Sequence, residues 1–264
     1  RDARRGTSRL GGRKTIHAHY DLGNAFYQLW LDRTMTYSSA RFDHPGQPLD
    51  QAQTAKYRKL GEGMGLKSGQ TVLEIGCGWG GFAELAAREV GAKVTGITIS
   101  EEQFKFAKER MFREGLSERA DIRFVDYRDV EGQFDRIVSI EMFEAVGEQH
   151  WPAYFKVVRD RLKPGGVAAL QIITIEDRRF EEYRGQADFI QMYIFPGGML
   201  PSPSILKREA TKQGLGFETA RTFALSYAET LRRWREVFDA RWETIQPLGF
   251  DERFKRMWDY YLAA

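Results

Sequence analysis

Residues 71–174 alternate between short apolar runs and amphipathic stretches, and this alternation limits the fold more than any other feature of the sequence. The runs that predict β-strands are 71–75, 93–98, 122–126, 134–140 and 167–174. The stretches between them that predict helices are 81–90, 101–115 and 149–162. Strands that alternate with helices form βαβ units with parallel strands. The sequence therefore predicts an α/β fold with a mainly parallel sheet and helices on both faces.

The flanking segments add helices and one more strand. Helices are predicted at 22–31, 49–63 and 203–213 and through the last 40 residues, and a sixth strand at 217–224. Residues 176–203 interrupt the alternation with a predicted inserted helix that is rich in aromatic and aliphatic side chains. A seven-stranded sheet would need a further strand after residue 264, so we expect the C-terminus to be truncated.

Composition excludes several classes of protein. No apolar run approaches the roughly 18 residues of a membrane span, and no secretory signal peptide is recognisable. The single Cys77 excludes a disulfide framework within the chain and a multi-cysteine zinc site, and no metal site is predicted. With a net charge of +3, the chain concentrates its basic residues in 1–14, which hold six basic side chains and one acid. We expect residues 1–16 to form a basic, flexible arm that either meets phosphates or stays solvated.

A glycine-rich turn follows the first predicted strand and opens a helix. Gly76, Gly78 and Gly81 fit the GxGxxG spacing of dinucleotide-binding enzymes. The acid that precedes the turn, Glu74, is instead typical of motif I in S-adenosylmethionine (SAM) methyltransferases. An NAD enzyme would place an acid at the end of the second strand, and this strand ends without one at Thr98.

Seven ordered motifs identify the chain as a member of the cyclopropane-fatty-acyl-phospholipid synthase family, which includes the mycolic acid cyclopropane synthases. The motifs are HYDLGNAFYQLWLD, TYSSARF, VLEIGCGWGGFA, GITISEEQ, YRDVEGQFDRIVSIEMFEAVG, LKPGG and FPGGMLPS, and the resemblance covers about residues 17–263. The resemblance implies a class I, Rossmann-like SAM-dependent methyltransferase domain over 17–264. It also implies that the inserted segment 176–203 is a helical lid over an acyl tunnel, although these apolar side chains would equally suit an ordinary core.

The resemblance implies a SAM site whose residues divide by the part of the donor they contact. Tyr37 and Ser38 would close over the methionine, Gly76 and Gly78 line it, Thr98 and Gln103 hold the ribose, and Tyr127 and Arg128 flank the adenine. Four of these positions have a structural alternative, and for Tyr127 and Arg128 it is an ordinary polar loop. Ser100 and Gln103 match a capping box that would explain Gln103 by itself, and Tyr37 is also explained as a packed aromatic residue.

The family uses bicarbonate as a general base, and the resemblance implies its ligand positions. These are Ser39, Glu144, Gln171 and Tyr227, where the family has Cys, Glu, His and Tyr. Glu144 and Tyr227 are retained. Ser39 and Gln171 can still form hydrogen bonds, but Gln171 cannot carry a proton as histidine does. A structural alternative for Glu144, together with Glu141, is a helix cap or an ion pair with arginine.

The resemblance implies methyl transfer from SAM to a carbon–carbon double bond of an unsaturated acyl chain, carried by a phospholipid. The two departures favour a methylated, methylene-branched or furan-precursor product, with a true cyclopropane synthase as the alternative. We expect a cytoplasmic enzyme, peripheral at the inner face of an anionic membrane; a homodimer is compatible with this, and no nucleic acid is expected. Three other hypotheses remain open: a methyltransferase of RNA or a small molecule, an NAD-dependent oxidoreductase, and a non-catalytic binding module.

Overall fold

The computed structural model describes residues 22–263, and the chain divides into two compact units. The sheet unit holds Leu60–Ala220. The helical unit holds Leu22–Lys59 together with the chain from Arg221 onward. The division falls inside helix α3 (Leu49–Gly63), whose bounds match the sequence prediction. The predicted basic arm lies outside the described residues.

Five parallel strands form the sheet in the order β3-β2-β1-β4-β5. Their bounds are β1 Thr71–Ile75, β2 Lys93–Thr98, β3 Ala120–Phe124, β4 Phe134–Ile140 and β5 Leu162–Gln171. Successive strands run outward from β1 in one direction and from β4 in the other. The order therefore reverses between β1 and β4, and ligands of open α/β sheets bind at the carboxyl ends of the strands at such a reversal.

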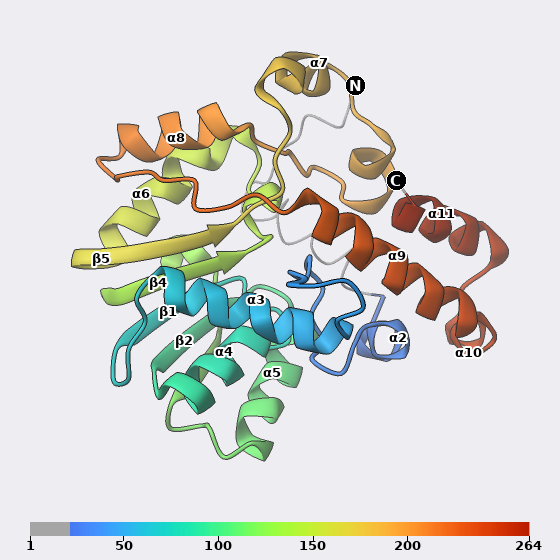
Figure 1. Ribbon diagram of the computed structural model, residues 1–264, viewed down its shortest axis with the longest axis horizontal. Coiled ribbons are helices and arrows are strands. Elements are labelled where there is room, and N and C mark those ends of the chain that lie inside the picture. The colour runs from blue at the N-terminus through green and yellow to red at the C-terminus, as the bar shows by residue number, and fades with distance from the viewer. Residues whose placement is uncertain (1–21, 264) are drawn as a thin grey trace. The chain divides into compact units, whose positions relative to one another are not determined.

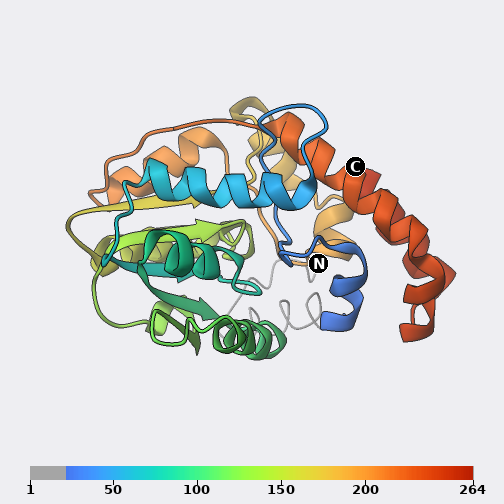
Figure 2. The ribbon, with the colours of Figure 1, turned by 60° about the horizontal axis from the view of Figure 1, so that its bottom comes forward.

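Helices cover both faces of the sheet, as predicted. Helices α4 (Gly81–Leu85) and α5 (Glu101–Arg113) lie on one face, and α6 (Trp151–Arg161) and α8 (Pro203–Lys212) lie on the other. Figure 1 shows these two pairs on opposite sides of the strands, and Figure 2 shows the same for α5 and α8. The π-helical turn η1 (Ala86–Val90) continues α4. The core beneath α6 and α8 combines apolar residues of the strands and both helices, among them Ile75, Ile137, Phe155, Val158 and Leu206.

The inserted segment contains two short helices where the sequence predicted one. These are α7 (Phe180–Gly185), which follows the 3-10 turn η5 (Asp177–Arg179), and the π-helical η6 (Ile190–Ile194). The break follows from local hydrogen bonds between Asp188 and Gln191. The Asp188 carboxylate accepts from the Gln191 backbone N–H, and the Gln191 side chain accepts from the Asp188 backbone N–H. This reciprocal pair starts a new helix and so ends the previous one.

The predicted strand over residues 217–224 is wrong. Residues 218–222 are exposed and join no ladder, and α9 (Ala224–Ala240) begins where the strand should end. A strand needs a partner for its backbone groups, and within the described residues this segment has none. β5 also begins earlier than predicted, because the LKPGG stretch joins the ladder with β4 through a register shift.

The helical unit is organised around buried aromatic rings. It contains α2 (Asn24–Trp30), most of α3, α9, α10 (Trp242–Ile245), η7 (Gln246–Leu248) and α11 (Glu252–Ala263). The Phe26 ring centroid lies 4.8 Å from that of Phe250 and 5.4 Å from that of Trp258. Each aromatic pair of this kind adds about 1 kcal/mol beyond the burial of its area. The prediction that the last 40 residues are helical is confirmed.

Candidate active site

The glycine turn after β1 is held open by its backbone conformation. Gly76 and Gly78 have φ values of +80° and +53°, which favour glycine. A Cβ at Gly76 would lie 2.7 Å from the Met142 side chain, whereas a Cβ at Gly78 would meet nothing within 4 Å. The Gly76 and Cys77 backbone N–H groups both donate to the Ile97 carbonyl, which ties the turn to β2. The turn therefore presents open space at Gly78.

Thr98, Ser100 and Gln103 form a hydrogen-bonded group at the end of β2. The Ser100 hydroxyl accepts from the Gln103 backbone N–H, so Ser100 is the N-cap of α5 as the structural alternative proposed. The Gln103 side chain does not close the capping box. Its Oε1 accepts from the Thr98 hydroxyl at 2.9 Å. Because both side chains are buried and joined, a ribose contact would have to use the Gln103 amide N–H₂, and that role stays a prediction.

Tyr127 and Arg128 form the short 3-10 turn η2 (Tyr127–Asp129) after β3. The buried Asp126 carboxylate accepts from the Arg128 side chain at 2.6 and 2.8 Å and from its backbone N–H at 3.0 Å. Burial raises the pKa of Tyr127 to about 12, so the phenol stays neutral. The Tyr127 ring packs 5.5 Å from the Tyr154 ring, which fixes its plane. These two side chains are therefore held in place, as an adenine contact would require.

Glu144 lies in the 3-10 turn η3 (Phe143–Ala145) after β4. Its Oε1 accepts from the Ile173 backbone N–H, and its Oε2 is buried without a hydrogen-bond partner. Burial is the main cause that raises the pKa of Glu144 to about 8, and the nearby Glu141 charge raises it further. Within residues 22–263, neither the helix cap nor the arginine pair proposed for Glu144 is present, so one carboxyl oxygen is left available there.

Glu141 and Gln171 are joined at the carboxyl ends of β4 and β5. The Gln171 Nε2 donates to Glu141 Oε1 at 2.8 Å, and the Glu141 backbone N–H donates to the Gln171 carbonyl at 2.8 Å. Glu141 adopts a φ of +48°, a left-handed conformation that non-glycine residues rarely hold. Strain of this kind gathers at functional sites. The sequence marked Glu141 only by its place after a strand, and its link to Gln171 was missed.

Further contacts connect residues 141–144, which include the two acids, to the glycine turn and to the inserted segment 176–203. Met142 lies against Gly76. The Met199 backbone N–H donates to the Glu144 carbonyl at 2.9 Å. The sheet unit therefore brings the turn, the two acids, Gln171 and the insert to the same edge of the sheet.

The remaining predicted residues belong to the helical unit. The Tyr37 hydroxyl donates to the Tyr261 hydroxyl at 3.0 Å, and its ring packs 5.3 Å from the Trp234 ring, as a packed aromatic would. Ser39 is buried, and its hydroxyl donates to the Ala40 carbonyl at 3.0 Å. Tyr227 is partly exposed in the first turn of α9. Ser39 and Tyr227 therefore belong to a different unit from Glu144, and their shared role stays a prediction.

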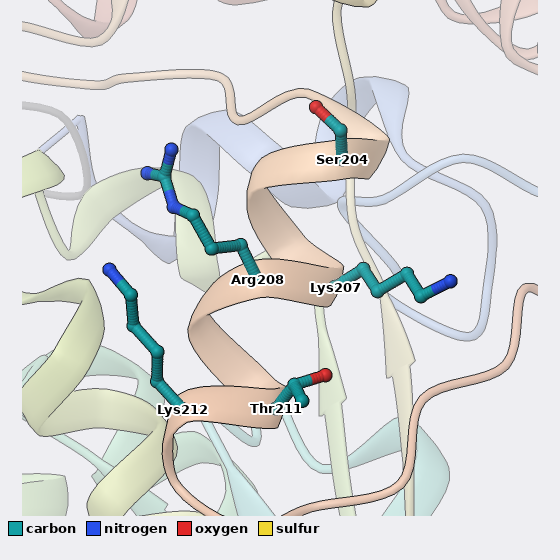
Figure 3. A pocket seen from close by; sticks show the side chains of 5 residues that line it. All are labelled: Ser204, Lys207, Arg208, Thr211 and Lys212. Atoms are coloured by element: carbon teal, nitrogen blue, oxygen red, sulfur yellow. The ribbon is translucent and has the colours of Figure 1, made fainter.

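A shallow hollow of about 420 Å³ lies on α8 in the sheet unit, and no sequence motif predicted it. It is lined by Ser204, Lys207, Arg208, Thr211 and Lys212. Figure 3 shows Lys207 projecting to one side of the helix and Arg208 and Lys212 to the other. Glu209 is buried and accepts from both Arg208 and Lys212. The outer surface of α8 is therefore basic.

Residues 22–263 contain neither a cluster of metal ligands nor a membrane-spanning helix. No group of three or more His, Cys, Asp or Glu side chains in this range is arranged to hold a metal ion. No helix in the same range is both long and apolar enough to cross a bilayer.

The chain is similar in sequence to a known protein family and to proteins of known function. The profile of the family described as mycolic acid cyclopropane synthetase matches residues 8–264. A tuberculostearic acid methyltransferase of Mycobacterium tuberculosis is 44% identical over 264 residues, covering 97% of this chain and 62% of the relative. The cyclopropane-fatty-acyl-phospholipid synthase of Escherichia coli K12 is 42% identical over 246 residues, covering 93% of this chain and 62% of the relative. The chain thus spans less than two thirds of the length of these curated relatives.

A solved structure gives the same result for the fold. The crystal structure of a mycolic acid cyclopropane synthase complexed with SAH and CTAB has a TM-score of 0.88 to this chain at 29% identity. The match covers 95% of this chain and 91% of that chain.

Proposed function

The chain belongs to the mycolic acid cyclopropane synthetase family, and on that premise we propose that it transfers the methyl group of SAM to a carbon–carbon double bond of an unsaturated acyl chain. The family, the α/β methyltransferase fold and SAM as donor agree with the sequence predictions. The match also disfavours the NAD-dependent oxidoreductase, in agreement with the neutral end of β2 at Thr98. SAM would bind at the open turn of Gly76 and Gly78, where it supplies an electrophilic methyl group on a sulfonium.

The resemblance implies a bicarbonate base, and the donors of the sheet unit do not fit one. The Ile173 N–H already donates to Glu144, and one N–H of the Gln171 amide already donates to Glu141. A bound anion would instead face the charge of Glu141, which disfavours it electrostatically. We therefore route no step through bicarbonate.

Glu144 is the proton acceptor that the geometry supports best. Methyl transfer leaves a carbocation on the acyl chain, and a C–H bond must then break to restore neutrality. The electron pair of that bond stays on carbon, and the proton goes to the unpartnered Oε2 of Glu144. A proton acceptor must lie within hydrogen-bond reach of the proton it takes. Among residues 22–263, Oε2 is a buried acceptor to which no other residue donates. This oxygen is the single observation that carries the proposal.

The identity of the product depends on whether a hydride shift precedes the loss of the methyl proton. Loss of a methyl proton with ring closure gives a cyclopropane, whereas a 1,2-hydride shift before that loss gives a methylene branch. We propose the methylene branch, because Gln171 cannot move a proton and is held by Glu141. Reduction of that branch to a methyl group needs a separate reductant.

Labelled SAM tests this proposal directly. The protein is incubated with [methyl-D₃]SAM and vesicles of an unsaturated phospholipid, and the released acyl esters are analysed by mass spectrometry. The cyclopropane and the methylene branch are isomers of equal mass, so ozonolysis must separate them. A mid-chain ketone after ozonolysis supports the methylene branch, an ozone-resistant product supports the cyclopropane, and no label in lipid refutes the proposed function. The same assay with the substituted pair Ser39→Cys and Gln171→His asks whether these two departures control the product.

We also propose that the enzyme works on acyl chains of anionic phospholipid membranes, with the basic surface of α8 as one contact. Each lysine or arginine near an anionic surface contributes about 1 kcal/mol. Replacing Lys207 and Lys212 by Gln should weaken binding to vesicles that contain phosphatidylglycerol and leave the weak binding to pure phosphatidylcholine unchanged. The matched control is Lys67→Gln, at an exposed lysine of the same unit. Equal binding of the double variant and the control would remove α8 from this contact.

A further inference from the structure

Three side chains of α3 hold the Thr36–Ser38 segment within the helical unit. Gln53, Lys56 and Tyr57 lie on one side of α3, and they are 0%, 2% and 7% exposed. A lysine is almost never buried to this extent without a specific partner. The segment they hold contains Ser38, which the family resemblance assigns to the methionine part of the donor.

The contacts fix both the backbone and the side chains of this segment. Gln53 Nε2 donates to the Ser38 carbonyl at 2.8 Å, and Lys56 Nζ donates to the Ser38 hydroxyl at 2.7 Å. The Tyr57 hydroxyl is hydrogen-bonded to the Thr36 hydroxyl at 2.8 Å. Side chains of one helix therefore hold two residues of the segment, Thr36 and Ser38.

The chemistry of Lys56 sets the direction of the Ser38 hydrogen bond. An ammonium group has three donors and no acceptor, so the Ser38 oxygen must accept from it. The hydroxyl hydrogen of Ser38 is then left to donate to another group. The nearby positive charge polarises that hydroxyl and makes it a better donor to an anion. The ammonium also lies 4.9 Å from the centre of the Tyr57 ring, which adds a cation–π attraction.

We propose that Lys56 is a positioning residue for the carboxylate of the methyl donor. It holds the Ser38 hydroxyl in the donor orientation and places a positive charge behind it, so that Ser38 recognises an α-amino acid carboxylate. This inference rests on the proposed function, because it takes the donor to be SAM. It assigns Lys56 no contact with the reacting methyl group.

The test compares two donors that differ only in the carboxylate: SAM and decarboxylated S-adenosylmethionine. Their affinities are measured by calorimetry for the wild type, Lys56→Met, Lys56→Arg and Ser38→Ala, with Lys59→Met as an exposed control on the same helix. Loss of a hydrogen bond to a charged group predicts about tenfold to hundredfold weaker SAM binding by Lys56→Met. Binding of the decarboxylated donor should be unchanged within about twofold. Lys56→Arg keeps the charge and should recover most of the SAM affinity.

Each outcome separates this inference from the proposed function. A wild type that binds neither donor refutes the proposed function. A wild type that prefers SAM, with Lys56→Met showing the same preference, overturns the role of Lys56. Equal weakening toward both donors indicates a merely structural lysine and overturns it as well. If Lys56→Met does not fold, Ser38→Ala decides, because it leaves the lysine in place: an unchanged preference for SAM would overturn the inference.

Discussion

Replacing Glu144 with Gln is expected to stabilise the protein at alkaline pH while it abolishes activity. Folded Glu144 holds its proton up to about pH 8, whereas in the unfolded chain this group releases it near its ordinary pKa of 4.5. Between these values the folded state binds more protons, so its stability is complete below pH 4.5 and falls as pH rises through about 8. At about 1.4 kcal/mol for each pH unit, this interval corresponds to at most about 5 kcal/mol. Gln has nearly the same shape, can accept from the Ile173 N–H and carries no charge.

The assay is urea unfolding of the wild type and Glu144→Gln between pH 5 and 9. The difference in unfolding free energy should be small at pH 5 and should favour the variant increasingly up to pH 9. Label transfer from SAM to lipid should be lost in the variant at every pH. A variant that is less stable than the wild type at pH 9, or that shows the same dependence on pH, would refute the burial argument for this carboxyl.

Four further predictions follow from the sheet unit. The activity of the wild type should rise with pH toward about 8 as Glu144 ionises. Glu141→Gln should move the midpoint of this rate profile to lower pH, because the variant removes a like charge next to Glu144. An unmoved midpoint would contradict this. Gly76→Ala should destabilise the fold by about 1–3 kcal/mol in urea, because its Cβ would meet a neighbouring methionine. Gly78→Ala should lose about 1 kcal/mol of stability, because a φ of +53° is strained for a residue with a side chain. It should also lose SAM affinity by calorimetry, because its Cβ projects into open space; normal affinity would place the donor elsewhere. Gln171→His should increase the ozone-resistant fraction of the product, and an unchanged fraction would show that this position alone does not select the ring.

Local patterns predicted the elements whose stability depends on near neighbours. The strands 71–75, 93–98 and 134–140 and the helix 49–63 have their predicted bounds, because continuous apolar runs and helical spacing are properties of the segment itself. Residues 217–224 have strand-forming composition and no partner strand, and composition cannot supply a partner. The inserted helix was predicted too long because the Asp188 and Gln191 hydrogen bonds were not recognised as a new start.

The candidate site was predictable as a set of residues and not as a set of contacts. Family motifs located Glu144 and Gln171 by position alone. The bond from Gln171 to Glu141 depends on the register that places Ile140 beside Gln171, which is a long-range property of the sheet. That Glu144 Oε2 has no hydrogen-bond partner within residues 22–263 depends on its burial by several separate segments. Neither can be obtained from spacing along the chain.

The amide at the end of β5 has a consequence for the timing of turnover. Gln171 neither gains nor loses a proton near neutral pH, so it cannot store the one that leaves the substrate. In the proposed reaction Glu144 must then deliver each proton to water before the next cycle begins. Small permeant buffers should therefore accelerate steady-state turnover, and heavy water should slow it, while a single cycle with preloaded substrate responds to neither.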